Sequence, residues 1–351
     1  MRSLEKWPAP LNDNRPWYNT RHWPRPVKDP DAHMPLKITS TFLDEVTCDI
    51  PAHNWGPGDW EREFDTFVEI GIDTVVLIRA GLGERLAYPS AVVARHTATL
   101  PVYVDMVELF LGLCDERGLR FFFGLYDSGY HWERYDWLTE VAINREFARE
   151  AWDRYGGHDA FRGWYLPHET ADTSHRIIDI NSALAEEVRG IADLPVLVSP
   201  YWNGRLDDGA SADIRGRLPL LSAEEQVRQC EEIFERFDGL VTHCAFQDGT
   251  AYELDLPEFL SGCRAAADRH HIDLWTNVET FDRDMPISFL PIEWRKLVNK
   301  LTAAEPYVSK AITFEFSHFL SPHSMWPSAR SLFERYHEYC RDEHKRLDRE
   351  G

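Results

Sequence analysis

Two glutamates each end a run of residues that has the composition of a β-strand. Glu169 closes the run Phe161-Arg-Gly-Trp-Tyr-Leu-Pro-His-Glu169, and Glu279 closes the run Asp273-Leu-Trp-Thr-Asn-Val-Glu279. Acidic residues are depleted in strands, so an apolar strand tip has no structural need of a carboxylate. Glycoside hydrolysis typically requires two carboxyl groups on either side of the bond that is cleaved. The pair therefore indicates that chemistry, provided that the fold brings the two strand ends together.

A third carboxylate, Glu315, belongs to the last strand-like run. Alternation along a strand predicts that Asn277 and Glu279 share an inward face. The same reasoning places Ile312 and Phe314 outward, which turns Glu315 inward. A buried charge needs a partner or a purpose, so the alternative is that Glu279 or Glu315 forms an ion pair with Arg79. For Glu169 the alternative is that it caps the next helix.

The elements that must position these residues alternate regularly along the chain. Strands are predicted over 37–43, 74–80, 120–126, 161–168, 195–202, 239–247, 273–279 and 310–316. Helices are predicted over 59–70, 101–117, 134–155, 174–190, 222–237, 256–271, 291–304 and 326–345. Eight strands alternating with eight helices predict a (β/α)8 TIM barrel, an α/β fold that would occupy residues 36–351. A doubly wound open sheet is the alternative, but it would require a glycine-rich turn after the first strand, and none is present.

Residues 1–35 differ in composition from the rest of the chain. Closely spaced prolines alternate with Trp7, Trp17 and Trp23, and such a density of proline excludes helices and central strands. We predict an extended, proline-rich N-terminal arm. Its tryptophans either dock on the barrel or reach a partner subunit, and the sequence leaves the oligomeric state open.

Polar and aromatic residues follow every predicted strand. In a TIM barrel the carboxyl ends of the strands form the active-site face. Flat aromatic faces there can stack on sugar rings, which makes Trp55, Trp132 and Trp202 candidate platforms. The full set of predicted substrate-binding residues is Asp44, Glu45, Trp55, Arg79, Asp127, Trp132, His168, Tyr201, Trp202, Gln247, Asp248 and Asn277.

Composition excludes several other classes of function. The formal net charge of −21 repels nucleic acid and anionic membranes. The six cysteines form no CxxC pair, and no secretory signal or membrane-spanning run is present, so we expect a cytoplasmic protein. No phosphate-binding loop, GxSxG elbow or HExxH motif occurs, so no cofactor and no metal are expected.

Several motifs resemble a bacterial family of TIM-barrel proteins that is catalogued as a domain of unknown function and described as glycosyl-hydrolase-like. They include Asn54-Trp-Gly-Pro57, Phe121-Phe-Phe-Gly-Leu-Tyr-Asp-Ser-Gly129, Gly163-Trp-Tyr-Leu-Pro-His-Glu169 and Trp275-Thr-Asn-Val-Glu279. The resemblance runs from about residue 36 to about residue 340. It implies the barrel and a glycosidase activity. Many retaining glycosidases on this fold have the acid/base after the fourth strand and the nucleophile after the seventh. One clan with that layout has asparagine before the fourth-strand glutamate, where this chain has His168.

The leading hypothesis is therefore a retaining glycoside hydrolase that cleaves an oligosaccharide, with Glu169 as acid/base and Glu279 as nucleophile. Glu315 is a rival for either role. A carbohydrate-binding barrel without catalysis is a second hypothesis. A sugar lyase or isomerase assisted by a metal on Asp127, Glu169, His243 and Glu279 is a third.

Overall fold

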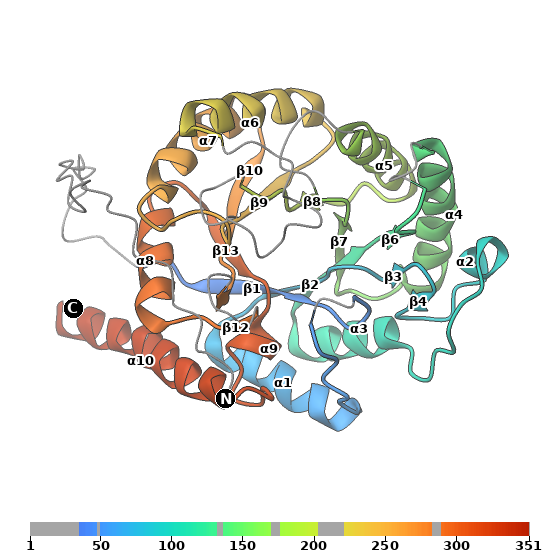
Figure 1. Cartoon of the computed structure of the whole chain (residues 1–351). Helices are drawn as coiled ribbons and strands as arrows, with labels where there is room; N and C mark the ends of the chain where they lie inside the picture. Colours follow the sequence, from blue (N-terminus) through green and yellow to red (C-terminus); the bar gives the residue numbers. More distant parts are fainter. Residues whose placement is uncertain are drawn as a thin grey trace, which may run out of the picture. The chain divides into compact units, whose positions relative to one another are not determined.

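The computed structural model describes residues 35–47, 50–131, 136–169, 176–202, 221–282 and 289–350. Within these residues, eight parallel strands close into a barrel (Figure 1), which confirms the predicted (β/α)8 fold. In order around the ring the strands are β1 (Ile38–Leu43), β2 (Thr74–Leu77), β5 (Arg120–Gly124), β7 (Phe161–Leu166), β8 (Val196–Val198), β9 (His243–Gln247), β10 (Asp273–Asn277) and β13 (Lys310–Thr313). Pairing of β13 with β1 closes the ring. The predicted arm lies outside the described residues, apart from Pro35.

Helices surround the barrel (Figure 1). They are α1 (Pro57–Ile70), α3 (Met106–Arg117), α4 (Trp137–Tyr155), α5 (Ile177–Ile191), α6 (Ala223–Phe237), α7 (Leu256–Arg269), α8 (Trp294–Ala304) and α10 (Pro327–Glu350). Local sequence explains several of their ends. Ser222 and Glu225 form the capping box that starts α6, and Gly118 ends α3 at a φ of 67°. Among the described helices, none combines the length and the apolar character that crossing a membrane requires.

Two apolar layers hold the barrel together. Alternate residues of each strand point inward, and Phe42, Val76, Phe122, Tyr165, Leu197, Ala245, Trp275 and Ile312 form the cluster that fills the barrel. The residues between them pack outward against the helices in a much larger cluster. Gly163 makes room in the inner layer, because a Cβ atom there would lie 2.2 Å from the Phe122 ring. Both faces of every strand are therefore buried, as is usual for a parallel sheet.

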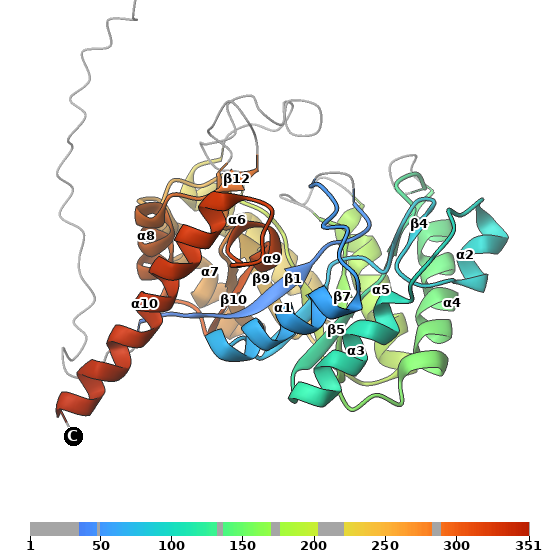
Figure 2. The ribbon, with the colours of Figure 1, turned by 90° about the horizontal axis from the view of Figure 1, so that it is seen from below.

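Short elements elaborate the end of the barrel where the strands finish. β3 (Gly81–Leu82), β4 (Arg85–Leu86) and β6 (Tyr126–Asp127) form a small sheet, and β11 (Phe281–Asp282) pairs with β12 (Leu290–Pro291). The short helices α2 (Ala91–His96) and α9 (Phe316–Phe319) follow β4 and β13. Figure 2 shows β4 and β12 at the same end of the barrel. Of the six cysteines, Cys48 lies outside the described residues, and the other five are buried and form no disulfide with one another.

Candidate active site

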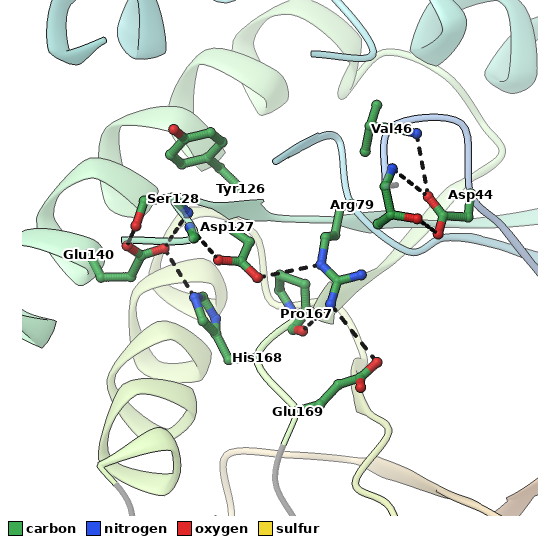
Figure 3. Close-up of polar contacts among 12 residues, drawn as sticks. Asp44, Val46, Arg79, Tyr126, Asp127, Ser128, Glu140, Pro167, His168 and Glu169 are labelled. Carbon is green, nitrogen blue, oxygen red and sulfur yellow. Dashed lines mark hydrogen bonds and ion pairs between the residues drawn. The ribbon is translucent and has the colours of Figure 1, made fainter. Parts of the chain in front are cut away.

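A buried arginine connects the ends of three neighbouring strands. Arg79 follows β2, and its Nε lies 3.5 Å from Oδ2 of Asp127, which belongs to β6 just after β5. Its Nη2 lies 3.9 Å from Oε1 of Glu169, which follows β7, and donates a hydrogen bond of 3.3 Å to the carbonyl of Pro167 (Figure 3). Burial acts to lower the pKa of Arg79, but Glu169 and Asp127 outweigh it and raise that pKa above its usual range. The guanidinium therefore stays charged.

The two acids that contact Arg79 differ in their access to solvent. The Asp127 side chain is 7% exposed, and its Oδ1 accepts a 2.8 Å hydrogen bond from the N–H of Gly129, which shapes the loop after β6. The Glu169 side chain is 28% exposed. Asp127 thus belongs to the wall of the mouth, whereas Glu169 presents a carboxylate that a ligand can reach.

His168 points away from Glu169, towards α4 (Figure 3). Its Nε2 lies 3.0 Å from Oε1 of Glu140, and neither side chain has any exposed surface. Burial acts to lower the pKa of His168, but the hydrogen bond with Glu140 outweighs it and raises that pKa. The carbonyl of His168 accepts a hydrogen bond of 3.0 Å from Asn181 of α5. In this conformation His168 anchors the segment that carries Glu169, and its ring offers no surface to a substrate.

Glu279 follows β10, is 2% exposed, and has its backbone held from both sides. Its N–H donates a 3.0 Å hydrogen bond to Oδ1 of Asp248, and its carbonyl accepts a 3.2 Å hydrogen bond from Nζ of Lys300 on α8. Asp248 and Lys300 are themselves 2.8 Å apart and form a buried ion pair. Burial raises the pKa of Asp248 to about 6, against the effect of Lys300. The structure thus places Asp248 behind Glu279 rather than on the surface of the mouth.

Asn277 and Gln247 tie neighbouring strand ends together. Asn277 Oδ1 accepts a 2.9 Å hydrogen bond from the N–H of Phe314, and Gln247 Nε2 donates one of 2.8 Å to the carbonyl of Ser199. Both side chains belong to residues that are almost fully buried. They close the floor of the mouth between β8, β9, β10 and β13.

The predicted parity of the last strand is wrong, and Glu315 is sealed from solvent. Ile312 packs in the interior cluster, which reverses the predicted parity of the last strand. β13 ends at Thr313, and the chain turns into α9, where His318 contacts the Glu315 carboxylate. Glu315 has no exposed surface, and burial raises the pKa of its carboxyl, against the effect of His318. Its carboxylate is therefore engaged by His318 rather than presented to solvent.

The segment after β1 contributes three of the predicted residues. Asp44 turns the chain, because its Oδ1 accepts hydrogen bonds from the N–H groups of Val46 (3.3 Å) and Thr47 (3.1 Å) (Figure 3). Oε1 of Glu45 lies 2.7 Å from Nδ1 of His53, and its side chain is 13% exposed. Trp55 is half-buried, with its ring centroid 4.1 Å from that of His53.

The predicted aromatic residues after β8 differ in position. Tyr201 is half-buried, and its backbone pairs with that of Gln247 of β9 as an isolated β-bridge. Trp202 is completely buried, with its ring stacked on Phe246 at 4.2 Å and on Phe259 at 5.2 Å. A ring enclosed on both faces cannot stack on a sugar, so Trp202 is a core residue and that expectation is wrong. Trp132 lies outside the described residues.

The four residues that would bind a metal in the lyase or isomerase hypothesis do not lie together. His243 is the first residue of β9 and pairs with Asp273, the first residue of β10. It therefore lies at the amino ends of the strands, whereas Asp127, Glu169 and Glu279 follow the carboxyl ends. The length of a strand separates them.

Sequence reasoning did not identify Glu140 or Lys300, although each contacts a predicted residue. Glu140 and Lys300 are buried on helices, where charged residues are usually solvated. Their one signal in the sequence is a charged residue on the side of a helix that faces the barrel. Recognising it requires knowing which side of each helix faces the barrel.

These features define the class: a TIM barrel with acidic residues at the carboxyl ends of its strands. The chain belongs to the family described as a domain of unknown function (DUF4434), whose model matches residues 38–326. It is similar to a solved structure of a protein from Bacteroides thetaiotaomicron VPI-5482 that was provisionally named an alpha-L-fucosidase. The identity is 39% and the TM-score 0.82, over 88% of this chain and 96% of the other.

The barrel is also similar to that of a GH10 endoxylanase from a sugarcane soil metagenome. There the identity is 6% and the TM-score 0.52, over 87% of this chain and 97% of the other, so the likeness concerns the fold alone. A search of curated proteins found no match.

Proposed function

We propose that this protein is a retaining glycoside hydrolase, with Glu169 as general acid/base and Glu279 as nucleophile. The observation that carries the proposal is that the two glutamates follow β7 and β10 of a closed barrel. The carboxyl ends of parallel strands open at one mouth, and only two strands, β8 and β9, separate this pair around the ring. A covalent double displacement needs the two carboxyl groups about 5 Å apart.

The surroundings of Glu169 suit a group that alternates between acid and base. In the first step Glu169 would give its proton to the leaving oxygen, and in the second it would accept one from water. Between the steps it is a carboxylate, and the charged Arg79 at 3.9 Å favours that form. Its 28% exposure leaves room for the leaving group and for the water that follows it.

The surroundings of Glu279 suit a fixed nucleophile. Asp248 and Lys300 hold both polar groups of its backbone, at 3.0 Å and 3.2 Å. A backbone fixed in this way limits the directions that the side chain can take, so less ordering remains for the reaction itself. Its burial also excludes bulk water from the site of the glycosyl–enzyme bond.

The substrate we propose is a neutral or lightly substituted oligosaccharide. Acidic side chains gather at the mouth, where Asp44, Asp127 and Glu169 all act electrostatically on Arg79. They can accept hydrogen bonds from sugar hydroxyls and disfavour anionic sugars. The half-buried Trp55 is the described aromatic residue that we propose as a stacking platform. Similarity to the provisionally named fucosidase makes an α-L-fucoside the first sugar to test.

The test is hydrolysis of a panel of fluorogenic glycosides, α-L-fucoside included, by the wild type and two variants. Glu169→Gln and Glu279→Gln should each lower kcat by about 10²–10⁴-fold or more, with unchanged circular dichroism. Glu146→Gln removes an exposed carboxylate of α4 and should leave the rate unchanged. A 2-deoxy-2-fluoro glycoside should label Glu279, and NMR should show retention at the anomeric carbon.

Two results would overturn the proposal. Full activity in both variants would remove these glutamates from the mechanism. Sugar binding by the wild type with no hydrolysis of any panel member would instead support the carbohydrate-binding alternative.

A further inference from the structure

A cluster of buried histidines and carboxylates lies at the seam where the barrel closes. It consists of Glu45, His53, Glu315 and His318, and is called here the histidine cluster. Glu45 and His53 belong to the connection between β1 and α1, and Glu315 and His318 follow β13. Because β1 pairs with β13, the two segments meet beside the mouth. None of the roles proposed for Glu169 and Glu279 uses these four residues.

The cluster brings three possible metal ligands together. One ligand atom from each of His53, Glu315 and His318 lies within 4.8 Å of the other two. The side chains of His53, His318 and Glu315 are 1%, 0% and 0% exposed. Tetrahedral ligands at metal distances are about 3.4 Å apart, so a small rotation of the side chains would be enough to enclose an ion.

Each histidine has one nitrogen held by an acceptor outside the triad. His53 Nδ1 lies 2.7 Å from Oε1 of Glu45, and His318 Nε2 lies 2.6 Å from the carbonyl of Pro51. Metal-binding histidines characteristically use their second nitrogen in this way, on a carboxylate or a backbone carbonyl, which fixes the ring and its tautomer. The remaining nitrogens are His53 Nε2 and His318 Nδ1, and the second of them contacts the Glu315 carboxylate.

Two polar atoms of the triad lack conventional partners. Across the described part of the chain, His53 Nε2 and Glu315 Oε1 make no hydrogen bond although both are buried. His318 Nδ1 contacts the other Glu315 oxygen. Buried polar atoms are rarely left unsatisfied, so two of them in one triad call for an explanation. A bound cation would satisfy both at once.

The charges around the cluster also favour a cation. Carboxylates outnumber the histidines, because Glu63 of α1 and Asp44 act electrostatically on the same residues as Glu45 and Glu315.

We propose that His53, His318 and Glu315 bind one divalent first-row transition-metal ion, with Glu45 and the Pro51 carbonyl orienting the two imidazoles. Two imidazoles and one carboxylate form a donor set suited to Zn²⁺. The ion would join the β1–α1 connection to the segment after β13. It would also fix His53, on which Trp55 packs at 4.1 Å, and so would set the edge of the mouth.

The experiment measures metal binding by the full chain after treatment with a chelator. Calorimetry with Zn²⁺ and elemental analysis should give one ion per chain. Co²⁺ should give the visible absorption of a nitrogen-ligated ion. His53→Gln and Glu315→Gln should abolish binding, and Glu45→Gln should weaken it by about 10–100-fold.

The control is His158→Gln, which changes a histidine paired with Asp115 at 2.6 Å elsewhere in the chain and should leave the stoichiometry at one. Absence of stoichiometric binding by the wild type would overturn the proposal, as would a Co²⁺ spectrum identical to that of the free aqueous ion. The same holds if His168→Gln abolishes binding and His53→Gln does not, because the ion would then occupy the triad of Asp127, Glu140 and His168. The wild-type measurements stand even where a variant fails to fold, and none depends on glycosidase activity.

Discussion

Replacing Lys300 with methionine tests whether a buried ion pair holds the backbone of Glu279. Lys300 and Asp248 are 5% and 1% exposed, with Nζ 2.8 Å from Oδ1. Methionine keeps most of the volume and removes the charge, so Asp248 would be left without its cation. Removing one partner from a buried pair costs about 3–5 kcal/mol, because the remaining charge is uncompensated. We expect a loss of this size in the free energy of unfolding at pH 8.

The loss should depend on pH in a defined direction. Burial already raises the pKa of Asp248 to about 6, so its protonated form favours the folded state, and stability falls as pH rises from about 4 to 6. Without Lys300 the pKa of Asp248 should rise further, and the fall should extend to higher pH. The difference between Lys300→Met and the wild type should therefore be smaller at pH 5 than at pH 8.

Lys296→Met provides a matched control on the same helix. Lys296 Nζ is also 2.8 Å from a carboxylate, that of Asp282, but these side chains are 29% and 13% exposed. A solvated pair contributes only about 0.2–1 kcal/mol. Urea unfolding followed by circular dichroism measures both variants, with equal slopes required for the comparison. Equal losses in the two variants, or a loss under 1 kcal/mol for Lys300→Met at pH 8, would refute the reasoning.

Three further predictions concern the barrel and its mouth. Arg79→Met removes the cation 3.9 Å from Glu169, so the alkaline limb of the pH–rate profile should move to higher pH; an unmoved limb would contradict the ion pair. Gly163→Ala places a methyl group 2.2 Å from the Phe122 ring and should lower stability by about 1–3 kcal/mol, measured by urea unfolding, whereas a neutral effect would mean that the ring moves freely. Trp202→Ala should cost about 3–5 kcal/mol in the same assay, and a stable variant with weakened sugar binding would restore Trp202 to the mouth.

The alternation of apolar runs was sufficient to predict the eight strands and their order, because each run had the length and composition of a buried strand. It was not sufficient to orient every strand. In a parallel barrel both faces are buried, so Ile312 inside and Ala311 outside are equally apolar. The orientation of β10 could be predicted because its inward face carries Asn277, whereas β13 ends before Glu315. A carboxylate or amide side chain thus marks the inner face only where it lies within the strand.

Some residues of the site could be predicted from the sequence and others could not. Arg79, Asp127 and Glu169 stand at strand ends, where position alone predicts that they approach one another. Glu140 and Lys300 reach the site from helices, and their contacts with His168 and Asp248 join residues far apart in sequence. No local pattern distinguishes them from solvated helical charges. Only the packing of helices on the barrel identifies them.

The three glutamates at strand ends differ by the cation that accompanies each. Glu169 lies beside Arg79 and keeps 28% of its surface exposed. Glu279 has its backbone held by Lys300, which leaves its side chain out of that ion pair. Glu315 contacts His318 with its carboxylate and has no exposed surface. A carboxylate that already holds a cation in a sealed site can bind a metal or stabilise the fold, but it cannot reach a sugar. The geometry thus separates Glu315 from the catalytic pair that we propose, and the metal titration and the glycoside panel test the two assignments independently.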